Sequence, residues 1–501
     1  MTDPDPIAEE VARIRKLFDS RLLSLVEERI IPLVERHGER ADVRKLYAEA
    51  LIEWLDHQQA ARVLETLVEE QPQDPVILRL LMNCYAAAAE PDKVKQISDR
   101  LLAMQPNRLD AIGPCVDAME RAGQFEEAER MFERLLALPA RSLEKAGPIR
   151  IPYLRARLLQ GRGQTEESIE LLQETIRSVD PEDLSDNDRP QYRELLFTLS
   201  KQLDRQGDYD GAWAAATAAH EDDGTPFDLD RYEKTMDDLR RVFTPEMSPR
   251  FARADAVTSE PLIIMGNPRS GTTLLDTILG MHAEVAQGGE LAASRFVQQA
   301  IPTVTDSFLP FPMNLVDLRV EDANKLGRIY ERQTEGLWDG RRYLSNKALA
   351  MHGQIGFLSL ALPRMRVINL FRHPLDNCIS CYMMNLLVSG HYYTNNLETL
   401  GKTWMIRRRM QEFWPDVLEV PVLELHYEDL VSDQENQTRR VLDFLDVPFD
   451  DACLSFHEAE GTAATLSYER VKQKMYTTSK GRWRNYEKHF GPLMDIVEPY
   501  V

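Results

Sequence analysis

The stretch Gly266-Asn-Pro-Arg-Ser-Gly271-Thr272-Thr273 decides the fold of the second half of this 501-residue chain. It follows the apolar run Leu262–Met265, which is typical of a buried strand, and it precedes a pattern that predicts a helix from Thr272. A G-x-x-x-x-G turn in that position directs backbone N–H groups and a helix N-terminus at one anion. The sequence therefore predicts a phosphate-binding loop at the end of a strand.

The residues around this loop indicate which anion it binds. In nucleotide triphosphatases a Lys follows the second Gly and reaches the β- and γ-phosphates, and the next hydroxyl residue binds Mg²⁺. This chain has Thr272 in the Lys position, and the strand predicted at 366–371 ends in Arg372 instead of an acidic Mg²⁺ ligand. A P-loop kinase is therefore a disfavoured alternative. The pattern favours a doubly anionic group held by Arg and hydroxyl side chains, with no metal.

Strand and helix patterns alternate throughout the second half. Apolar runs at 366–371 and 422–427 are typical of strands. Each precedes a helical pattern, which covers 379–387 after the first run and reaches Leu445 after the second. This alternation is typical of a parallel sheet, whose ligands bind at the carboxyl ends of the strands. We expect residues 258–501 to form an α/β domain with a P-loop-like parallel sheet.

The first half has a helical pattern with an internal period. Gln71-Pro72 recurs 34 residues later as Gln105-Pro106. Three turns share the form G-x-x-x-x-A/S, in which Gly ends one helix and a small residue lets the next pack closely, and they begin at Gly123, Gly163 and Gly207. Such units resemble tetratricopeptide repeats, which build a concave surface. We expect an all-α domain of tetratricopeptide-type helical repeats over 1–220 and a linker over 221–257.

The charge is unevenly distributed along the chain. The net charge of −22 comes from 82 acidic and 60 basic residues, and residues 1–250 carry −16 of it, from 50 acidic and 34 basic residues. A surface of this sign repels the phosphates of nucleic acids and of anionic membranes. We therefore expect neither nucleic acid nor membrane partners, and an anionic ligand fits the less acidic second half better.

Cysteine usage and the N-terminus indicate the compartment. The five cysteines are odd in number and scattered, which disfavours a disulfide-stapled secreted scaffold. Cys378 and Cys381 form a C-x-x-C, but no second pair completes a zinc site, so we expect two packed thiols. The acidic start has no signal-peptide pattern, and no apolar run approaches the roughly 20 residues that span a bilayer. These features predict a cytoplasmic protein.

Two motifs in the second half resemble sites in a known enzyme family. The run Pro268–Leu274 resembles the 5′-phosphosulfate loop of the sulfotransferases, in the form found in protein-tyrosine sulfotransferases. Arg372 with Ser380 eight residues later is similar to their 3′-phosphate site for the donor 3′-phosphoadenosine 5′-phosphosulfate (PAPS). The resemblance covers residues 258–500 and implies sulfuryl transfer from PAPS to a hydroxyl group, leaving 3′-phosphoadenosine 5′-phosphate (PAP). The donor contacts that it implies are Arg269, Ser270, Gly271, Thr272, Thr273, Arg372, Ser380, Tyr427 and Arg482.

The resemblance also implies catalytic residues. Glu290, in Gln287-Gly-Gly-Glu290, matches the family's general base. Lys347, in Ser345-Asn-Lys347, matches the lysine that steadies the moving sulfuryl group, a task that Arg269 shares. In an in-line displacement, negative charge builds on the oxygen that leaves with the nucleotide, so cations fixed there stabilise the transition state. A carboxylate with an ordinary pKa of about 4.3 is a weak base, and burial would strengthen Glu290.

The base and the acceptor have alternatives at this point. His282 and His391 are rival bases, since other sulfotransferases use His, and His391 is also a candidate acceptor contact in a loop over the site. The acceptor hydroxyl belongs to a peptide tyrosine, a carbohydrate or a small molecule, and the repeats would recruit it. A non-catalytic interaction protein, with partner-binding repeats and a nucleotide-binding second half, is the alternative from a different class.

One position departs from the family pattern. The tyrosine enzymes place a basic residue four positions after the serine of the 3′-phosphate site, and this chain has Met384 there. The 3′-phosphate therefore needs another cation. The stretch near the C-terminus that contains Lys480, Arg482 and Arg484 could supply it.

Overall fold

The computed structural model describes residues 5–501 except 21–22, 55, 89, 107–108, 145–146, 187, 223–224, 388–389 and 459–478. Contacts divide the chain into two compact units, the first ending at Gln202 and the second beginning at Leu203. The division lies inside α12 (Arg189–Gln206), so the next helix, α13 (Tyr209–Glu221), belongs to the second unit. Within the described residues, no helix is both long and apolar enough to cross a bilayer.

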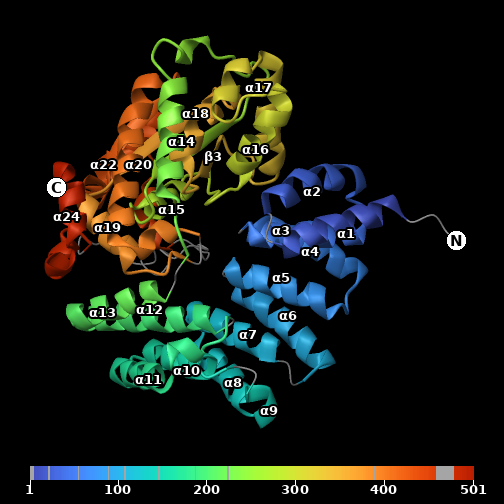
Figure 1. The fold of residues 1–501 in the computed structure, drawn as a ribbon, viewed down its shortest axis with the longest axis vertical. Helices are drawn as coiled ribbons and strands as arrows, with labels where there is room; N and C mark the ends of the chain where they lie inside the picture. The colour runs from blue at the N-terminus through green and yellow to red at the C-terminus, as the bar shows by residue number, and fades with distance from the viewer. Residues whose placement is uncertain are drawn as a thin grey trace. The chain divides into compact units, whose positions relative to one another are not determined.

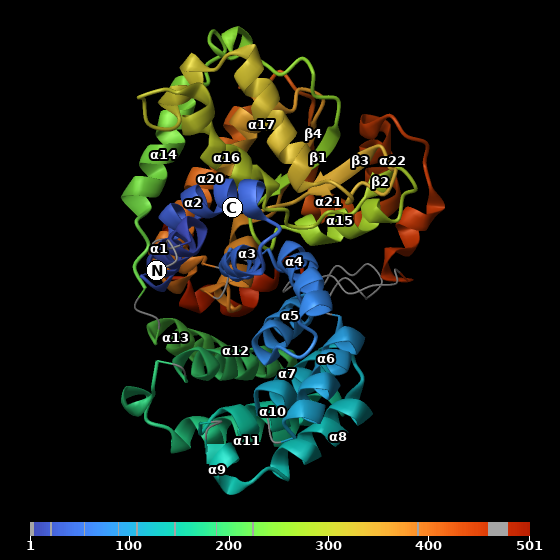
Figure 2. The ribbon, with the colours of Figure 1, turned by 90° about the vertical axis from the view of Figure 1, so that its right-hand side faces the viewer.

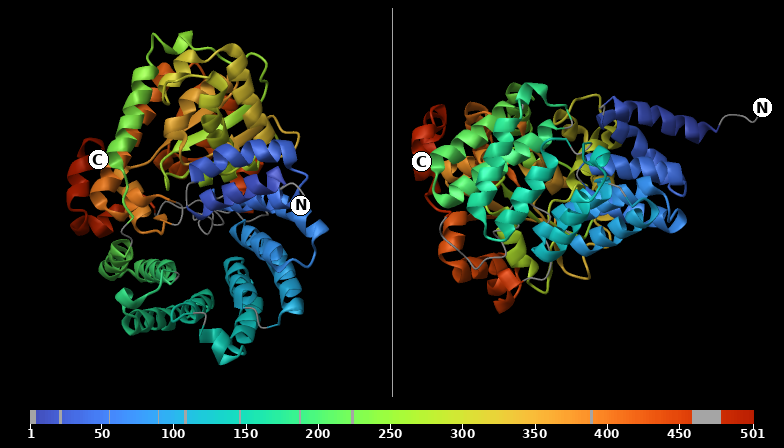
Figure 3. Two further views of the ribbon diagram at one scale, coloured as in Figure 1. Left: turned by 45° about the vertical axis from the view of Figure 1, so that its right-hand side comes forward. Right: turned by 90° about the horizontal axis from the view of Figure 1, so that it is seen from below.

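Every regular element described in the first unit is a helix. The elements are α1 (Pro6–Asp19), α2 (Leu23–His37), α3 (Ala41–Glu53), α4 (His57–Glu70), α5 (Pro75–Ala87), α6 (Pro91–Met104), α7 (Leu109–Arg121), α8 (Phe125–Leu136), α9 (Ala140–Leu143), α10 (Arg150–Gly161), α11 (Thr165–Ser178), η2 (Pro181–Asp183) and most of α12. From α1 to α8, helices that follow one another in the chain pack together (Figure 1, Figure 3). Their shared core is apolar, with Leu46, Leu64 and Leu78 fully buried. The predicted all-α repeat fold is confirmed.

The turns between repeat helices depend on glycine. The residues after α7, α10 and α12 include three glycines with φ of 75°, 80° and 87°, namely Gly123, Gly163 and Gly207. Glycine adopts this left-handed conformation without the strain that a side chain adds. The small residues five positions later are fully buried, namely Ala128, Ser168 and Ala212. The predicted turn, with a Gly at the helix end and a small residue in the next helix, is confirmed.

The second unit contains a five-stranded parallel sheet in the order β2-β3-β1-β4-β5. The strands are β1 (Glu260–Gly266), β2 (Val285–Ala286), β3 (Tyr343–Asn346), β4 (Arg366–Phe371) and β5 (Val422–His426). The helices after α13 are α14 (Leu229–Val242), η3 (Ser248–Arg250), α15 (Thr272–Gly280), α16 (Ala293–Thr305), η4 (Met313–Asp317), α17 (Val320–Gln333), α18 (Met351–Ala361), α19 (Pro374–Tyr382), η6 (Tyr392–Asn395), α20 (Leu397–Val417), α21 (Tyr427–Ser432), α22 (Gln434–Leu445), η7 (Asp451–Glu458), η8 (Arg482–His489), α24 (Pro492–Val497) and η9 (Glu498–Tyr500). The predicted parallel α/β fold is confirmed.

Both faces of the sheet are covered by helices (Figure 2). Along β1, Ile263 and Met265 face one core, which α14, α16, α17, α18 and α20 complete. Leu262 and Ile264 face the other core, completed by α15 and α22. β1 lies between β3 and β4. The strands that follow β1 in the chain, β2 and β3, lie on one side of it, and the next two, β4 and β5, lie on the other side. Such a switch point, at the carboxyl ends of the strands, is where open α/β sheets bind ligands.

Some boundaries differ from the prediction. The apolar pattern did not reveal β2, which has two residues, or β3, in which Ser345 and Asn346 face a buried polar network. The predicted helix over 379–387 is α19, which ends at Tyr382. Leu386 and Leu387 are buried beyond its end, so burial in a loop explains their apolar character.

Candidate active site

The phosphate loop joins β1 to α15 at the carboxyl edge of the sheet. Arg269 and Gly271 have φ of 66° and 100°, so the chain turns tightly at two left-handed residues. A Cβ on Gly271 would lie 2.5 Å from Cδ2 of Tyr427, so only Gly lets the aromatic ring pack against the loop. Thr272 and Thr273 begin α15 and are buried. The N-terminus of α15 thus lies directly behind the turn, where an anion is favoured.

The two sequence motifs meet at this loop. Arg269 Nε donates a hydrogen bond of 3.3 Å to Ser380 Oγ. Arg372 Nη1 donates to the carbonyl oxygen of Arg269 at 2.5 Å. The guanidinium carbon of Arg372 lies 4.6 Å from the ring centroid of Tyr427. The structure therefore brings Arg269, Arg372, Ser380 and Tyr427 together, as a shared ligand would require.

The polar atoms at this junction fit an anionic ligand. Ser270 is 1% exposed, and within the described part of the chain its Oγ has no hydrogen-bond partner. The same holds for the buried Nε of Arg372. A buried polar group without a partner costs about 1–3 kcal/mol, which a bound acceptor atom would offset. Two guanidinium groups, a hydroxyl group and a helix N-terminus suit a phosphate or sulfate oxygen.

Glu290 and Lys347 form an ion pair beside the loop. Lys347 Nζ lies 2.8 Å from Glu290 Oε1, and the side chains are 2% and 42% exposed. Lys347 follows β3, and its N–H donates a hydrogen bond of 2.8 Å to the carbonyl oxygen of Gly289. Glu290 is thus not deeply buried. Its carboxylate is instead open to a second molecule on one side and neutralised by a buried ammonium on the other.

A buried network that was not predicted from the sequence supports these two loops. Asp276 on α15 is 1% exposed and accepts hydrogen bonds from Ser345 Oγ and, at 3.2 Å, from Gln287 Nε2. Ser345 Oγ accepts at 3.0 Å from the N–H of Gly288. Burial raises the pKa of Asp276, although the charge of Lys347 opposes that rise. The signal that could have identified it is an acidic residue inside an otherwise apolar helix.

Arg482 is engaged by an acidic partner at the end of α12. Its guanidinium pairs with Asp204, and the hydroxyl of Tyr486 donates to the same carboxylate. The Arg482 and Asp204 side chains are 18% and 15% exposed, so the pair is largely buried. The family resemblance places Arg482 among the implied donor contacts, whereas its acidic partner lies on α12; Arg269, Arg372, Ser380 and Tyr427 contact one another.

The C-terminal segment is docked on the helix that carries Ser380. Asp376, on the first turn of α19, accepts hydrogen bonds from the N–H groups of Gly481 at 2.6 Å and Trp483 at 2.9 Å. Arg372 Nη2 donates to the carbonyl oxygen of Ser479 at 3.1 Å. The segment that was expected to supply an extra cation therefore starts beside Arg372.

Arg484 belongs to η8, in the C-terminal segment. Its guanidinium carbon lies 4.8 Å from the Trp483 ring, which stacks on His373 with centroids 5.8 Å apart. Burial lowers the pKa of His373; the charges of Asp376 and Glu428 oppose this effect, and those of Arg484 and Arg372 add to it. Lys480 contacts Ser432 Oγ at 2.8 Å.

The two rival bases have different environments. His282 is 2% exposed; its Nε2 lies 2.9 Å from the carbonyl oxygen of Pro448, and its Nδ1 accepts from the N–H of Glu284 at 3.1 Å. It therefore closes the end of α15. Burial lowers the pKa of His391 to about 3, with the charge of Arg407 adding to the effect. An imidazole with that pKa is a weak base.

All five cysteines are free, buried thiols. Cys381 Sγ lies 3.4 Å from the carbonyl oxygen of Pro268 in the phosphate loop. Burial raises the pKa of Cys378 and raises that of Cys381 to about 11. The C-x-x-C is thus a pair of packed thiols, as expected.

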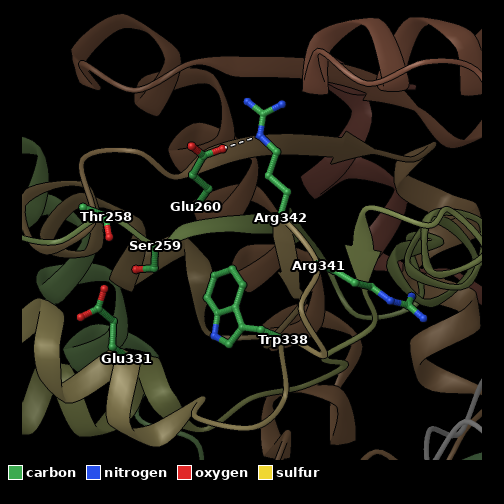
Figure 4. A pocket seen from close by; sticks show the side chains of 7 residues that line it. All are labelled: Thr258, Ser259, Glu260, Glu331, Trp338, Arg341 and Arg342. Atoms are coloured by element: carbon green, nitrogen blue, oxygen red, sulfur yellow. Dashed lines mark hydrogen bonds and ion pairs between the residues drawn. The ribbon is translucent and has the colours of Figure 1, made fainter.

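A separate pocket lies at the opposite edge of the sheet (Figure 4). Its cavity of about 440 Å³ is lined by Thr258, Ser259, Glu260, Glu331, Trp338, Arg341 and Arg342. It opens at the amino ends of β1 and β3, whereas the phosphate loop follows the carboxyl end of β1. Glu260 and Arg342 pair at 2.8 Å and neutralise each other. This cavity is therefore not part of the candidate active site.

Two regions of the chain match the models of known protein families. Residues 261–451 match the family model described as the sulfotransferase family, and residues 55–113 match that of the tetratricopeptide repeat. Each of these two matches covers less than half of the chain. The sulfotransferase-family match includes the phosphate loop, Glu290, Lys347, Ser380 and Tyr427, whereas Arg482 lies beyond it.

Proteins similar to this chain include an uncharacterized protein and a named enzyme. An uncharacterized protein of Aquifex aeolicus (strain VF5) is 24% identical over 429 residues, which cover 84% of this chain and 54% of that protein. Protein-tyrosine sulfotransferase 1 of Danio rerio is 25% identical over 225 residues, 42% of this chain and 61% of that protein. The chain thus spans between half and two thirds of the length of these curated relatives.

A solved sulfotransferase domain is also similar to part of the chain. The sulfotransferase domain from the Synechococcus PCC 7002 olefin synthase is 21% identical, with a TM-score of 0.34, and the match covers 47% of this chain and 90% of that domain.

Proposed function

We propose that this protein is a PAPS-dependent sulfotransferase, which transfers a sulfuryl group to an acceptor hydroxyl and releases PAP. The observation that carries the proposal is the junction of Arg269, Ser380 and Arg372 at the phosphate loop. The family resemblance assigns these residues to the two anionic ends of one donor, and they lie in direct contact. The match of residues 261–451 to the sulfotransferase family supports the same reaction class.

The donor would be held by the loop and by α19. Backbone N–H groups of the loop, with Ser270, Thr272 and Thr273, would bind the 5′-phosphosulfate, because hydroxyl groups and a helix N-terminus favour doubly anionic oxygens. Arg372 and Ser380 would bind the 3′-phosphate. Tyr427 packs against both Gly271 and Arg372 and would fix their positions. No step in this scheme requires a metal ion.

Glu290 and Lys347 would share the chemistry with Arg269. As the acceptor oxygen bonds to sulfur, Glu290 takes the hydroxyl proton; the bond between sulfur and the bridging phosphate oxygen breaks, and PAP leaves with that electron pair. Lys347 and Arg269 stabilise the charge that develops on the bridging oxygen. Lys347 Nζ lies 2.8 Å from Glu290 Oε1. When the donor binds, the ammonium of Lys347 would contact the sulfuryl group instead of the carboxylate, and Glu290 would then be free to accept the proton.

The acceptor would be a peptide tyrosine or another hydroxyl compound, and the repeats would recruit it. A phenol has a pKa of about 10 and is almost entirely protonated at neutral pH, so a base is useful for such an acceptor. We also propose a cytoplasmic location, because all five cysteines are free thiols in the buried interior.

Thermal stabilisation tests the donor. A ligand at 100 times its Kd stabilises the folded state by about 2.7 kcal/mol, so PAP should raise the melting temperature and Mg²⁺-ATP should not. Incubation with ³⁵S-labelled PAPS and candidate acceptors, followed by mass spectrometry, should then give a sulfated product. Stabilisation by Mg²⁺-ATP alone would indicate a kinase, and PAP binding without any product would indicate the non-catalytic alternative.

A further inference from the structure

The buried guanidinium of Arg407 has no acidic partner among the described residues. Arg407 on α20 is 6% exposed. Its Nε donates to the hydroxyl of Tyr232 and its Nη1 to the hydroxyl of Tyr393, each at 3.0 Å. Its Nη2 donates no hydrogen bond within the described residues. Removing a charge from water costs several kcal/mol unless an opposite charge offsets it, and two neutral phenols supply none.

Further buried polar atoms without a described partner lie on α20 itself and on α18, which packs against α20. Thr403, one helical turn before Arg407, is fully buried, and its Oγ1 has no described hydrogen-bond partner. His352 on α18 is 1% exposed, and both of its ring nitrogens lack such a partner. Burial lowers the pKa of His352 well below its ordinary value, and the charge of Arg407 contributes. Buried polar groups in folded proteins are nearly always paired, so this cluster fits a bound polar group.

The fold places this cluster at the same edge of the sheet as the phosphate loop. Gln411 Nε2 donates to Asn369 Oδ1 and to the carbonyl oxygen of Leu370, at 2.9 and 3.0 Å, near the carboxyl end of β4. α20 precedes β5, which is parallel to β4, so α20 runs from the carboxyl edge toward the amino edge. Arg407 is one turn earlier than Gln411 and is therefore closer to the carboxyl edge.

An anion bound by Arg407 would belong to the acceptor and not to the donor. The donor's two anionic ends are already accounted for by Arg269, Arg372 and the loop. His352, in contrast, begins α18, the helix that follows Lys347, and Lys347 marks the reacting end. Tyr393 belongs to the segment that also carries His391, between α19 and α20.

We propose that Arg407, with Thr403 and His352, forms an anion-binding subsite that selects acceptors carrying a carboxylate in addition to the reacting hydroxyl. The subsite rests on the proposed sulfotransferase function. Arg407 donates its remaining N–H groups to the carboxylate, and Thr403 and His352 supply further hydrogen bonds. Tyr232 and Tyr393 position the guanidinium, because they hold its other nitrogens and face it with their rings at 5.8 and 4.7 Å.

Two phenols that differ in one charge test this subsite. The probes are 3-(4-hydroxyphenyl)propionate and its methyl ester, titrated by calorimetry into the PAP-saturated full-length protein. A hydrogen bond to a charged group contributes about 1.5–3 kcal/mol, so the carboxylate should bind roughly 10–100-fold more tightly than the ester. Arg407→Gln should abolish this preference, and Arg407→Lys should restore part of it.

Arg409→Gln is the matched control, because Arg409 is an exposed cation on the same helix, 3.5 Å from Glu233. It should leave the preference intact. Equal affinity of wild-type protein for the two probes, or an equal loss of both in Arg407→Gln, would overturn the subsite. PAP titration separates this failure from that of the proposed function: absent PAP binding contradicts the function, whereas intact PAP binding without a carboxylate preference contradicts the subsite alone.

Discussion

Lys347 Nζ lies 2.8 Å from Glu290 Oε1, so the proposed transition-state cation and the proposed base are counter-ions of each other. The pair joins the end of β3 to the loop that follows β2, and a backbone hydrogen bond from Lys347 to Gly289 holds the same two loops together. Because Lys347 is 2% exposed, its ammonium needs an anionic partner at all times. A sulfuryl group that takes over this role leaves Glu290 free at the moment when a base is needed.

Removal of the cation should therefore reduce chemistry more than donor binding. Lys347→Ala should lower kcat by about 10²–10³-fold, the usual cost of losing one group that stabilises the transition-state charge. The affinity for PAP, which lacks the sulfuryl group, should change little. Steady-state kinetics with labelled PAPS and calorimetry with PAP measure the two effects.

Lys402→Ala is the control for that variant, because Lys402 is half exposed and pairs with Glu398 on the surface of α20. It should retain wild-type kcat. Turnover undiminished in Lys347→Ala would remove Lys347 from the mechanism.

Glu290→Gln should lower kcat by about 10²–10⁴-fold if Glu290 is the general base.

Gly271→Ala should impair donor binding through sterics. The added Cβ would lie 2.5 Å from Tyr427 Cδ2, and φ of 100° is unfavourable for a side chain. The loop or the ring must move, so PAP affinity should fall by at least tenfold in calorimetry. Gly336→Ala separates the two causes, since Gly336 also has positive φ but a Cβ added there would meet no described atom within 4 Å. An equal loss of PAP affinity in both variants would contradict the role of the Tyr427 contact.

The phosphate loop and the repeat turns could be predicted because glycine spacing at a strand or helix end reports backbone geometry directly. Arg372 and Ser380 were assigned from the family resemblance, because their spacing after an apolar strand alone indicates no site. The short strands β2 and β3 carry too few apolar residues to be visible, and β3 includes Ser345 and Asn346. Asp276 could not be assigned because its hydrogen-bond partners, Gln287 and Ser345, lie in distant parts of the sequence.

The Arg482 pairing shows why residue type alone does not define a contact. A basic residue near the C-terminus fits an anionic donor on charge, yet Asp204 engages it. Arg482→Gln should therefore lower the melting temperature while PAP affinity changes less than about threefold, or 0.65 kcal/mol. A double-mutant cycle with Asp204→Asn should give a coupling energy of about 0.5–3 kcal/mol. A tenfold loss of PAP affinity at unchanged stability would make Arg482 a direct donor contact instead.

Asp276 should make stability depend on pH. Burial raises its folded-state pKa above the ordinary value of 3.8, so the folded protein keeps this proton to higher pH than the unfolded chain. The stabilising contribution is fully present below about pH 3.8 and is lost as pH rises through the folded pKa. Asp276→Asn removes this loss, so the melting temperature of the variant should rise relative to wild type between pH 4 and pH 7. Asp339→Asn is the control, because Asp339 is 82% exposed. The difference in melting temperature between this variant and wild type should not change between pH 4 and pH 7. A constant difference between Asp276→Asn and wild type across this range would show that Asp276 titrates alike in the folded and unfolded states.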